Sequence, residues 1–455
     1  MFKIGELSKR ANISVSTIRF YEEKGLIYPA KVDQWTKYRY YDESSIVKLN
    51  EIAYFKNLGF SLEEILKLDE QTIKNKIDEV QNRIKQLRSN VNILSSIQKE
   101  KEKKMKKSQL VNEILKILEE NHKNLYHSVA KEEIKKFLSS VDWDHTSEHE
   151  FNYNMLKLFS KFKDSQTNWV VNYKYLDRRV CEIEGKLYLE VGHNFYEILK
   201  IGEVDSQSLI KEFKSLLCYE TEAMFNRCLR SALNNGYYYE LLNIAKDNKF
   251  NIIVKTNNGE KQFKIKITNE AVLMRGKRLE NYSFDVLDNN VLYIQYFKCK
   301  NAEKYPFEIF VADIKKEIEQ KNIKNFILDL RGTREGGSVL IQPLKNLIIE
   351  KQLNGVLLIN DGTAGCGVWA VYDFKKNLNV KLIGEATGGA TKRYGETKHF
   401  NIENYVFTAS LKLFDITDVF NYSGSIKPDI FVPETKKAIE EGIDTQLEVA
   451  IQQFV

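Results

Sequence analysis

The sequence lacks long apolar runs. No stretch approaches the roughly 20 consecutive apolar residues that a membrane-spanning helix needs, and the mean hydropathy is −0.42. The N-terminal residues MFKIGELSKR continue directly into an amphipathic helical pattern, without the apolar core of a signal peptide. We therefore expect a soluble, cytoplasmic protein with no membrane partner.

Cysteines are few, and none lies in a CxxC pair. The sequence contains five, at positions 181, 218, 228, 299 and 366. An odd number without paired spacing argues against a disulfide framework and against a zinc knuckle, so we expect reduced thiols. His145 and His149 are four residues apart, but no third ligand is evident near them. We expect no metal ion and no other cofactor.

The net positive charge lies at the start of the chain. Residues 1–107 contain 22 Lys and Arg against 15 Asp and Glu, whereas the other 348 residues contain 47 against 48. The net charge of +6 therefore arises from the N-terminal part. A basic N-terminal part on a nearly neutral remainder is typical of a nucleic-acid-binding domain.

Residues 1–41 have the pattern of a helix-turn-helix followed by a wing. Ile4, Leu7 and Ala11 form one apolar face, residues 12–14 break it, and Ser14 can cap a second helix. Side chains of this second helix can donate to phosphates or base edges, and alternating basic and aromatic residues of the wing suit backbone contacts. The candidate DNA-binding residues are Ser16, Thr17, Arg19, Tyr21, Lys37, Tyr38 and Arg39.

The segments IGELSKRANISVSTIRFYEEKGLI, YRYY and LGFSLEEI resemble the winged helix-turn-helix of the MerR family, in the same order and spacing. Two positions depart from the family pattern. Lys31 stands where arginine is common, and Lys37 stands where glycine often precedes the Tyr-Arg pair. The resemblance implies that double-stranded promoter DNA and RNA polymerase are partners.

Residues 71–107 have the heptad pattern of a coiled coil. Apolar side chains alternate at spacings of four and three, namely at Ile73, Ile77, Val80, Ile84, Leu87, Val91 and Leu94. The pattern predicts a homodimer, although an amphipathic helix packed on its own domain would show similar spacing. The sequence does not set the direction of the two strands, and the lysine-rich residues 99–107 predict a solvated hinge.

The remaining residues change from helices to short strands and then to an alternating pattern. Residues 108–162 read as helices, and about 180–270 as short strands with one helix near 208–217, including an aromatic strand region at Tyr237–Tyr239. From 290 onward we expect strands at 291–297, 325–330, 356–360 and 381–385, and helices at 306–320, 338–350 and 364–377. This alternation predicts a layered α/β core.

The segments FILDLRGTREGG and LLINDGTAGCGVWAVYDFKKNLNVKLIGEATGGATKRYGE resemble a tail-specific, or C-terminal processing, serine protease. LEENHKNLYHSVAKEEI and IGEVDSQSLIKEF are similar to its helical segment and PDZ-like module, so the resemblance spans roughly residues 108–455. It implies a ClpP/crotonase-like core.

The residues needed for protease chemistry are absent from the matching positions. The family uses a hydroxyl nucleophile at a helix start and a buried lysine as its base. Gly365 stands at the serine position, Ala390 at the lysine position, and Gln166 where a related branch has histidine. Glu335 replaces the first glycine of the turn that helps to form the oxyanion hole. These changes predict a pocket that binds a ligand and does not catalyse.

Cys366 supports an alternative interpretation. It lies one residue past the expected nucleophile, at a helix N-terminus that favours a thiolate. A shift of one residue in alignment would make it a nucleophile or a redox sensor, with Lys392 and Arg393 as the nearest basic residues. An inert, buried thiol is the simpler interpretation. The candidate ligand-binding residues are Gln166, Gly336, Gly337, Gly365, Cys366, Trp369 and Arg393.

We therefore predict an α+β multidomain protein. Its expected parts are a MerR-like winged helix domain (1–70), a dimerisation coiled coil (71–107), a helical subdomain (108–175), a PDZ-like β-rich module (176–270) and a ClpP/crotonase-like pseudo-peptidase effector domain (271–455). The expected function is that of a dimeric transcriptional regulator that senses a small-molecule or peptide effector. It is not expected to be an enzyme. The alternative is a DNA-tethered peptidase that uses Cys366 as its nucleophile.

Overall fold

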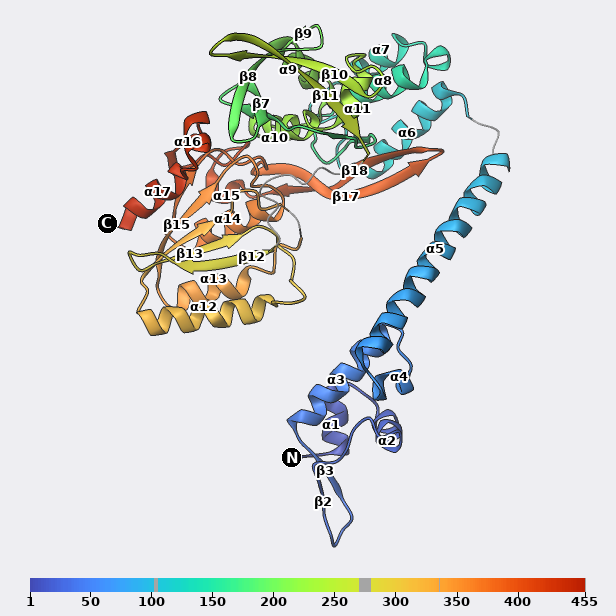
Figure 1. Cartoon of the computed structure of the whole chain (residues 1–455), viewed down its shortest axis with the longest axis vertical. Helices are drawn as coiled ribbons and strands as arrows, with labels where there is room; N and C mark the ends of the chain where they lie inside the picture. The colour runs from blue at the N-terminus through green and yellow to red at the C-terminus, as the bar shows by residue number, and fades with distance from the viewer. Residues whose placement is uncertain (102–104, 270–279, 335, 455) are drawn as a thin grey trace. The chain divides into compact units, whose positions relative to one another are not determined.

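The computed structural model describes residues 1–101, 105–269, 280–334 and 336–454, and the side chains of these residues other than 96–101. The chain divides into two compact units, residues 1–104 and residues 105–455 (Figure 1). We call residues 1–70 the head and residues 105–455 the body, and describe each separately. Within the described residues, no helix is both long enough and apolar enough to cross a bilayer.

The head begins with the predicted helix-turn-helix. Helix α1 (Ile4–Ala11) ends at Asn12, whose φ of 53° is left-handed, and α2 (Val15–Glu23) begins after Ser14. The hydroxyl of Ser14 accepts the Thr17 N–H at 3.1 Å, which is the N-cap interaction expected from the sequence. Leu7 and Ile18 are completely buried between the helices, so the predicted motif is confirmed.

The wing is a small antiparallel sheet in the order β1-β3-β2, made of β1 (Phe2–Lys3), β3 (Arg39–Tyr41) and β2 (Lys31–Val32). At its tip, Asp33 Oδ1 accepts the N–H groups of Trp35 at 3.0 Å and Thr36 at 2.7 Å. Lys37 has a φ of 57°, in the left-handed region that favours glycine. The wing therefore keeps the turn despite the lysine.

Two further helices, α3 (Glu43–Asn57) and α4 (Leu62–Leu66), complete the head. Ser61 and Glu64 form a reciprocal capping box at the start of α4. The head has its own hydrophobic core, whose buried members are Leu7, Ile18, Leu26, Ile27, Tyr41, Leu49, Ile52, Phe60 and Ile65.

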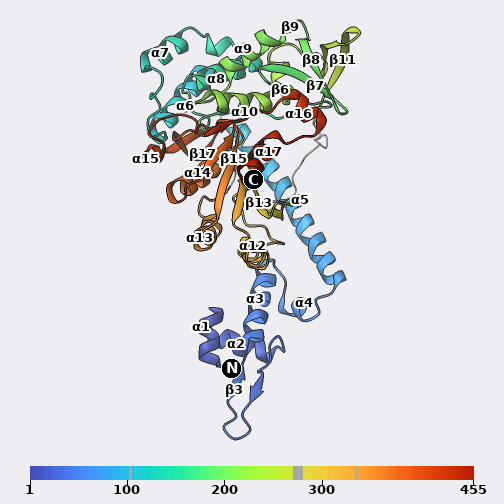
Figure 2. The ribbon, with the colours of Figure 1, turned by 90° about the vertical axis from the view of Figure 1, so that its left-hand side faces the viewer.

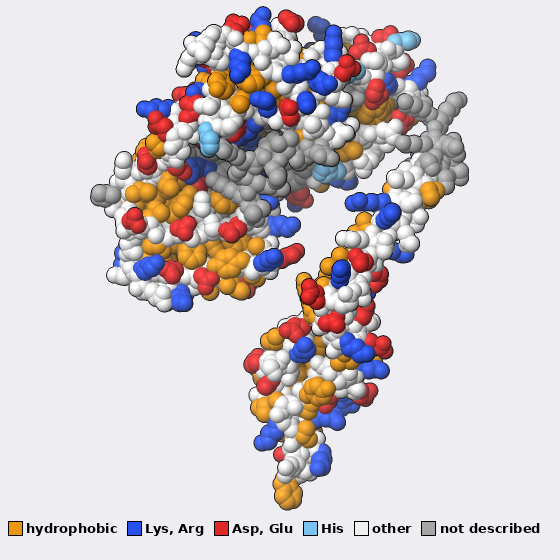
Figure 3. Space-filling view, in the orientation of Figure 1, with side chains coloured by type: hydrophobic (Ala, Val, Ile, Leu, Met, Phe, Trp, Pro, Cys, Tyr) orange, Lys and Arg blue, Asp and Glu red, His pale blue; other side chains and the backbone are white. Residues whose placement is uncertain are grey.

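Helix α5 (Glu70–Lys101) is a single 32-residue helix. Its seven heptad side chains, at positions 73, 77, 80, 84, 87, 91 and 94, are each between 40% and 65% exposed. The stripe is therefore not packed on the chain's own domain, so that interpretation of the heptads is wrong. The space-filling view shows hydrophobic side chains between charged ones along this helix and on the head (Figure 3). Dimerisation through the stripe stays a prediction.

The body starts with the helices α6 (Lys107–Asn121), α7 (Lys131–Ser139) and α8 (Glu148–Ser160). A seven-stranded sheet follows, in the order β5-β11-β10-β8-β7-β6, with β9 paired to β8. Its strands are β5 (Tyr175–Leu176), β6 (Val180–Ile183), β7 (Lys186–Val191), β8 (Asn194–Ile201), β9 (Val204–Asp205), β10 (Lys249–Thr256) and β11 (Gly259–Thr268). The helices and this sheet share one core cluster.

Three helices lie between β9 and β10, where we expected only one. They are α9 (Ser206–Leu216), α10 (Glu222–Ala232) and α11 (Gly236–Leu241). The prediction of a strand at Tyr237–Tyr239 is wrong, because these residues lie on α11. The Asn235 side chain caps this helix by accepting the Tyr237 N–H at 3.1 Å. Tyr238 and Tyr239 are buried in the core.

The C-terminal part of the body is built on a six-stranded sheet in the order β12-β13-β14-β15-β16-β19. All pairs are parallel except β12 with β13. The strands are β12 (Tyr282–Val286), β13 (Val291–Tyr296), β14 (Asn325–Asp329), β15 (Asn354–Ile359), β16 (Lys381–Gly384) and β19 (Ile430–Phe431). The alternating strands and helices predicted from residue 290 onward are confirmed.

Helices cover both faces of this sheet (Figure 2). Helices α12 (Phe307–Lys321), α13 (Gln342–Glu350) and α14 (Cys366–Asn377) share one core cluster with it. Helix α17 (Thr445–Ile451) contacts the other face at β15 and β16. The remaining elements are η1 (Trp143–His145), α15 (Thr417–Phe420), α16 (Lys436–Glu441) and η2 (Gln452–Phe454).

A long hairpin of β17 (Lys392–Ile402) and β18 (Tyr405–Asp415) extends from this part of the body. Strand β18 also pairs with β4 (Trp169–Val170), which follows the helical segment. The hairpin thereby brings residues near 166 to the start of α14.

Candidate DNA-binding surface and ligand pocket

The candidate DNA-binding side chains of the head differ in exposure. Ser16 and Arg19 on α2 are exposed, as are Lys37 and Tyr38 on the wing, whereas Thr17 and Tyr21 are half-buried. The Thr17 hydroxyl lies 2.7 Å from the hydroxyl of Ser14 and so belongs to the cap. Arg19 is therefore the exposed cation among the candidate residues of α2.

Arg39 also contacts the helix-turn-helix. Its Nε lies 3.1 Å from Glu22 Oε1, and Tyr41 donates to Glu22 Oε2 at 3.1 Å. Burial raises the pKa of Tyr41 to about 12, and the Glu22 carboxylate acts in the same direction. Glu22 thus ties the wing to the end of α2, a link that the sequence pattern did not reveal.

The wing tip carries an aromatic side chain that the sequence analysis missed. Trp35 is 93% exposed, although burial of a tryptophan contributes much to a core. Its neighbour Thr36 and the Asp33 carboxylate fix the backbone turn beneath it. A lone tryptophan in a polar segment was the available signal, and its exposure suits contact with a partner surface.

The body contains a cavity of about 360 Å³ at the start of α14. Six of the seven candidate ligand-binding residues line it: Gln166, Gly336, Gly365, Cys366, Trp369 and Arg393. Sequence reasoning missed Glu220, Arg227 and Arg334, which line it too. These residues come from the helical segment, from α10 and its approach, and from the six-stranded sheet region. That a ligand binds there stays a prediction.

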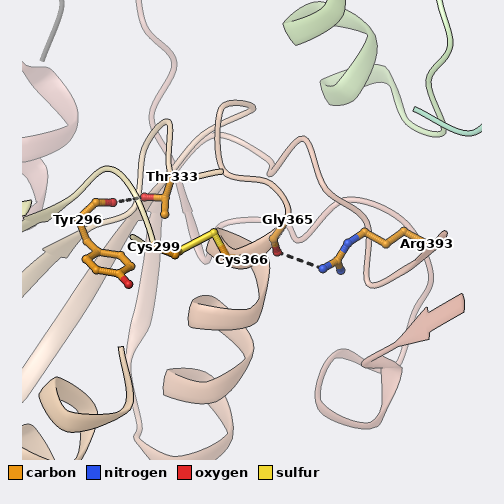
Figure 4. Close-up of a disulfide and its surroundings, with 6 residues drawn as sticks. All are labelled: Tyr296, Cys299, Thr333, Gly365, Cys366 and Arg393. Carbon is orange, nitrogen blue, oxygen red and sulfur yellow. Dashed lines mark hydrogen bonds between the residues drawn. A yellow bond between two sulfur atoms is a disulfide. The ribbon is translucent and has the colours of Figure 1, made fainter. Parts of the chain in front are cut away.

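Arg393 is the most buried charged group of the cavity, with 8% of its surface exposed. Its Nη2 donates to the Gly365 carbonyl at 3.1 Å (Figure 4). Its Nη1 donates to the Ala390 carbonyl at 3.0 Å. The guanidinium carbon lies 5.8 Å from the ring centroid of Trp369 and 5.7 Å from that of Phe414. Burial lowers the pKa of Arg393 to about 10, which leaves it cationic at neutral pH.

Glu220 is an acidic residue that also lines the cavity. Burial raises its pKa to about 7, and the Asp164 carboxylate acts in the same direction. The Ser165 N–H donates to Glu220 Oε2 at 3.1 Å and opposes this rise. Glu220 is therefore partly protonated at neutral pH, so that the cavity has an excess of positive charge.

A buried pair of side chains, His122 and Asp164, lies next to Gln166. The Asn124 N–H donates to His122 Nδ1 at 3.0 Å, so the other ring nitrogen, Nε2, carries the proton and donates to Asp164 at 3.0 Å. Burial opposes ionisation of Asp164, but hydrogen bonds from His122, Thr167 and the Gln166 N–H outweigh it and lower its pKa. The pair anchors the loop that presents Gln166, whose Oε1 accepts from Thr397 at 2.8 Å.

Backbone groups of the glycine turn near residue 336 pair with another segment of the chain. The Gly337 N–H donates to the Cys299 carbonyl at 2.8 Å, and Gly336 pairs with Cys299 as a β-bridge. Gly337 is not among the residues that line the cavity, and its role as a ligand-binding residue stays a prediction. Glu335, the predicted replacement in this turn, lies outside the described residues.

Cys366 is not a free thiol, because it forms a disulfide with Cys299 (Figure 4). The expectation of reduced thiols throughout is therefore wrong for this pair. The parallel strands place the end of β13 beside the start of α14, although 67 residues separate the two cysteines. Cys181, Cys218 and Cys228 are free. Among the described residues, no group of three or more His, Cys, Asp and Glu could hold a metal ion.

Gly365 has a backbone conformation that excludes most side chains. Its φ is 53° and its ψ is −118°, and a Cβ would lie 2.9 Å from the Arg334 carbonyl oxygen. Ala390, at the expected lysine position, is 2% exposed. Lys392 pairs with Asp415 at 3.3 Å.

The head matches a known family of regulatory proteins. Residues 2–72 match the MerR HTH family regulatory protein domain. The HTH-type transcriptional regulator ZntR of Escherichia coli (strain K12) is 32% identical over 106 residues, covering 22% of this chain and 74% of that protein. The chain belongs to the MerR family of helix-turn-helix regulatory proteins.

A second relative matches this chain over a smaller part of its own length. The multidrug-efflux transporter 1 regulator of Bacillus subtilis (strain 168) is 34% identical over 97 residues, covering 21% of this chain. The chain spans 35% of that relative's length.

The body resembles the solved structure of mature CPAF in fold. Mature CPAF with lactacystin aligns with a TM-score of 0.54 and the CPAF S499A mutant with 0.57, each at 11% identity, over 77% of this chain and 97% of that chain. A photosystem II D1 C-terminal processing protease is a weaker match, with a TM-score of 0.42, 10% identity, and coverage of 77% and 97%. The likeness to CPAF shows the fold of the body.

Proposed function

We propose that the protein is a dimeric, effector-responsive transcriptional regulator whose protease-like body binds a ligand without cleaving it. One observation carries this proposal. A MerR-type head is joined to a body that keeps a cavity of about 360 Å³, while Gly365 and Ala390 occupy the expected nucleophile and base positions.

Promoter DNA is the proposed partner of the head. Arg19 on α2 and the basic and aromatic wing present donors to phosphates and base edges. Distortion of a promoter with an overlong spacer, so that RNA polymerase engages both elements, is the mechanism that the family implies. In this proposal the effector-bound body biases that distortion.

The heptad stripe of α5 is the proposed dimer contact. Seven apolar side chains remain exposed along one face of the helix. Burial of such a seam against a second copy contributes roughly 25 cal/mol per Å² of apolar surface. Two heads in one dimer would then read a pseudo-palindromic site.

The cavity favours an effector that carries an anionic group. Arg227, Arg334 and Arg393 line it with Glu220 and Glu396 as the acidic side chains. A buried guanidinium can bind a carboxylate through two parallel hydrogen bonds. The effector is thus proposed to be a small acid or a peptide with an acidic group.

Selection of duplexes from a random DNA pool by the full-length protein tests the proposal. We expect recovery of a pseudo-palindromic site bound by two chains, as measured by light scattering of the complex. Recovery of no preferred sequence would contradict the regulator proposal. Arg19→Ala should abolish the enrichment, whereas Lys48→Ala, an exposed residue of α3 paired with Glu51, should retain it.

A DNA-tethered peptidase is the second candidate function. The observation in its favour is that Cys366 lines the cavity at the N-terminus of α14. The Cys299–Cys366 disulfide blocks the sulfur from acting as a nucleophile, so this candidate requires prior reduction.

A further inference from the structure

The Cys299–Cys366 disulfide joins two segments beside the cavity (Figure 4). Cys366 is the first residue of α14 and lines the cavity. Cys299 follows the end of β13 and is not one of the lining residues. Both are buried, with 6% and 3% of their surfaces exposed. We propose that these two cysteines form a reversible thiol–disulfide pair whose redox state sets the shape of the cavity.

The site differs chemically from the other cysteines of the chain. Burial raises the pKa of Cys181 and of Cys228 to about 11, and that of Cys218 well above the usual value. These thiols are protonated and unreactive at neutral pH. Cys366 instead begins a 12-residue helix, where the helix dipole favours a thiolate, and it has a bonded partner.

The compartment supports a reversible role. On the proposed function, the protein binds DNA where glutathione keeps most thiols reduced. Disulfides in such compartments are usually transient or redox-sensing. Because Cys366 lines the cavity, a small thiol that enters the cavity reaches its sulfur first.

The bond holds together segments that line the cavity. The Cys299 carbonyl accepts the Gly337 N–H, and the Cys299–Gly336 bridge leaves no room for a Cβ at Gly336. Thr333 Oγ1 donates to the Tyr296 carbonyl (Figure 4). The Thr333 carbonyl accepts the Ala364 N–H at 2.9 Å. The disulfide adds a covalent link between this turn and α14. When the disulfide is reduced, these hydrogen bonds connect the turn to its neighbours without a covalent link to α14.

Oxidation proceeds by thiol–disulfide exchange with glutathione disulfide. The Cys366 thiolate attacks one sulfur of glutathione disulfide, and one glutathione leaves as a thiolate. The Cys299 thiol loses its proton to solvent and attacks Cys366 Sγ in the mixed disulfide, which releases the second glutathione thiolate. The two cysteines lose two electrons, which reduce glutathione disulfide to two glutathiones. Excess reduced glutathione reverses both steps.

Redox titration of the full-length protein tests the proposal. Protein equilibrated in glutathione buffers is quenched with acid, alkylated with N-ethylmaleimide in denaturant and mapped by mass spectrometry. We expect Cys299 and Cys366 to change together from alkylated to protected as glutathione disulfide increases, and to return. Cys181, Cys218 and Cys228 should be alkylated throughout. A pair that stays bonded, or stays reduced, at every ratio overturns the proposal.

Two variants separate the steps. Cys299→Ser removes the attacking partner, so Cys366 should retain glutathione as a stable mixed disulfide. Cys228→Ser is the matched control and should titrate like the wild type. A Cys299→Ser protein that takes up no glutathione would show that Cys366 is not the residue that attacks glutathione disulfide, and would overturn this assignment.

Fluorescence of Trp369 tests the effect on the cavity without an effector. This side chain lies one turn after Cys366 and lines the same cavity. We expect a spectral shift between oxidised and reduced wild type that is lost in Trp369→Phe. An unchanged spectrum, with a pair that still titrates, would overturn the coupling to the cavity. This readout needs neither DNA nor effector, so its failure is distinguishable from failure of the proposed function.

Discussion

At the scale of single residues, Arg19 and Arg39 are predicted to act differently although both are exposed cations. Arg19→Ala and Arg39→Ala should each weaken DNA binding by more than about tenfold, because a charge-assisted contact is lost. Arg39→Ala also breaks the ion pair with Glu22, a partly exposed pair worth at most about 1 kcal/mol. Gel-shift titration at fixed salt measures affinity, and calorimetry measures the head's stability.

Glu22→Gln serves as the control for that second effect. It removes the ion pair but not the arginine charge, so it should lower stability slightly and leave DNA affinity near that of the wild type. Unchanged affinity in both arginine variants would remove these two residues from the DNA-binding surface.

Glu220 predicts a pH dependence of the body's stability. Its pKa is raised from 4.5 to about 7, so its protonated form is favoured in the folded state. The resulting stability is fully present below pH 4.5 and is lost as the pH rises to about 7. Glu220→Gln should therefore be more stable than the wild type at pH 8, by at most about 3 kcal/mol.

Thermal unfolding of the full chain at pH 5 and pH 8 measures this difference. Glu396→Gln is the matched control, because Glu396 lines the same cavity but is exposed and paired with Lys412 at 2.6 Å. A Glu220→Gln protein with the same pH profile as the wild type would show that the carboxyl is not held protonated.

Several residues of the cavity were predictable from the sequence, whereas the buried carboxyl of Glu220 and the disulfide were not. The resemblance to the proteases located Gln166, Gly365 and Arg393, which come together only in the fold. Glu220 carried no signal, because one glutamate among the 63 acidic residues matches no motif. The disulfide was also hidden, since its spacing of 67 residues is set by strand order and not by local pattern.

At the scale of elements, the helices and strands predicted after residue 290 agree with the structure, with small shifts at their ends. They have strong periodicity and are buried, so pattern and fold agree there. The error at Tyr237–Tyr239 has a local cause. Aromatic residues favour strands, but Asn235 caps a short helix whose tyrosines pack into the core.

Helix α5 gives a prediction about assembly. Ile84→Lys combined with Val91→Lys places two charges per chain in the apolar seam, which costs several kcal/mol, so the protein should become monomeric. Light scattering of the full-length protein measures the change. Gln81→Lys with Ser89→Lys adds the same charges outside the heptad positions and should leave a dimer. A dimer that persists in the Ile84/Val91 variant would place the contact in the body.

At the scale of the whole molecule, the two units carry two different kinds of similarity. The head matches relatives in sequence, whereas the body matches solved structures at 11% identity, which shows its fold alone. Local motifs suffice for the head because its candidate DNA-binding residues lie within one short segment, residues 16–39. The cavity of the body depends on residues from distant segments, so its ligand could not be predicted from the sequence.

The absence of peptidase activity is the prediction that belongs to the whole molecule. Gly365 has no side chain, Ala390 has only a methyl group, and the Gly337 N–H already donates to Cys299. Without a nucleophile and a base, no acyl-enzyme can form. We expect no cleavage of unfolded peptide substrates by the wild type, either oxidised or after reduction with dithiothreitol.

Gly365→Ser should remain inactive, because φ at this position is 53° and a Cβ would contact the Arg334 carbonyl, so the hydroxyl is not held in place. The decisive comparison uses reduced wild type and Cys366→Ala in the same peptide assay. Cleavage by the reduced wild type that Cys366→Ala abolishes would establish the tethered peptidase instead. Cys228→Ala, which changes a free thiol that is not one of the lining residues, is the control for loss of activity through general thiol effects.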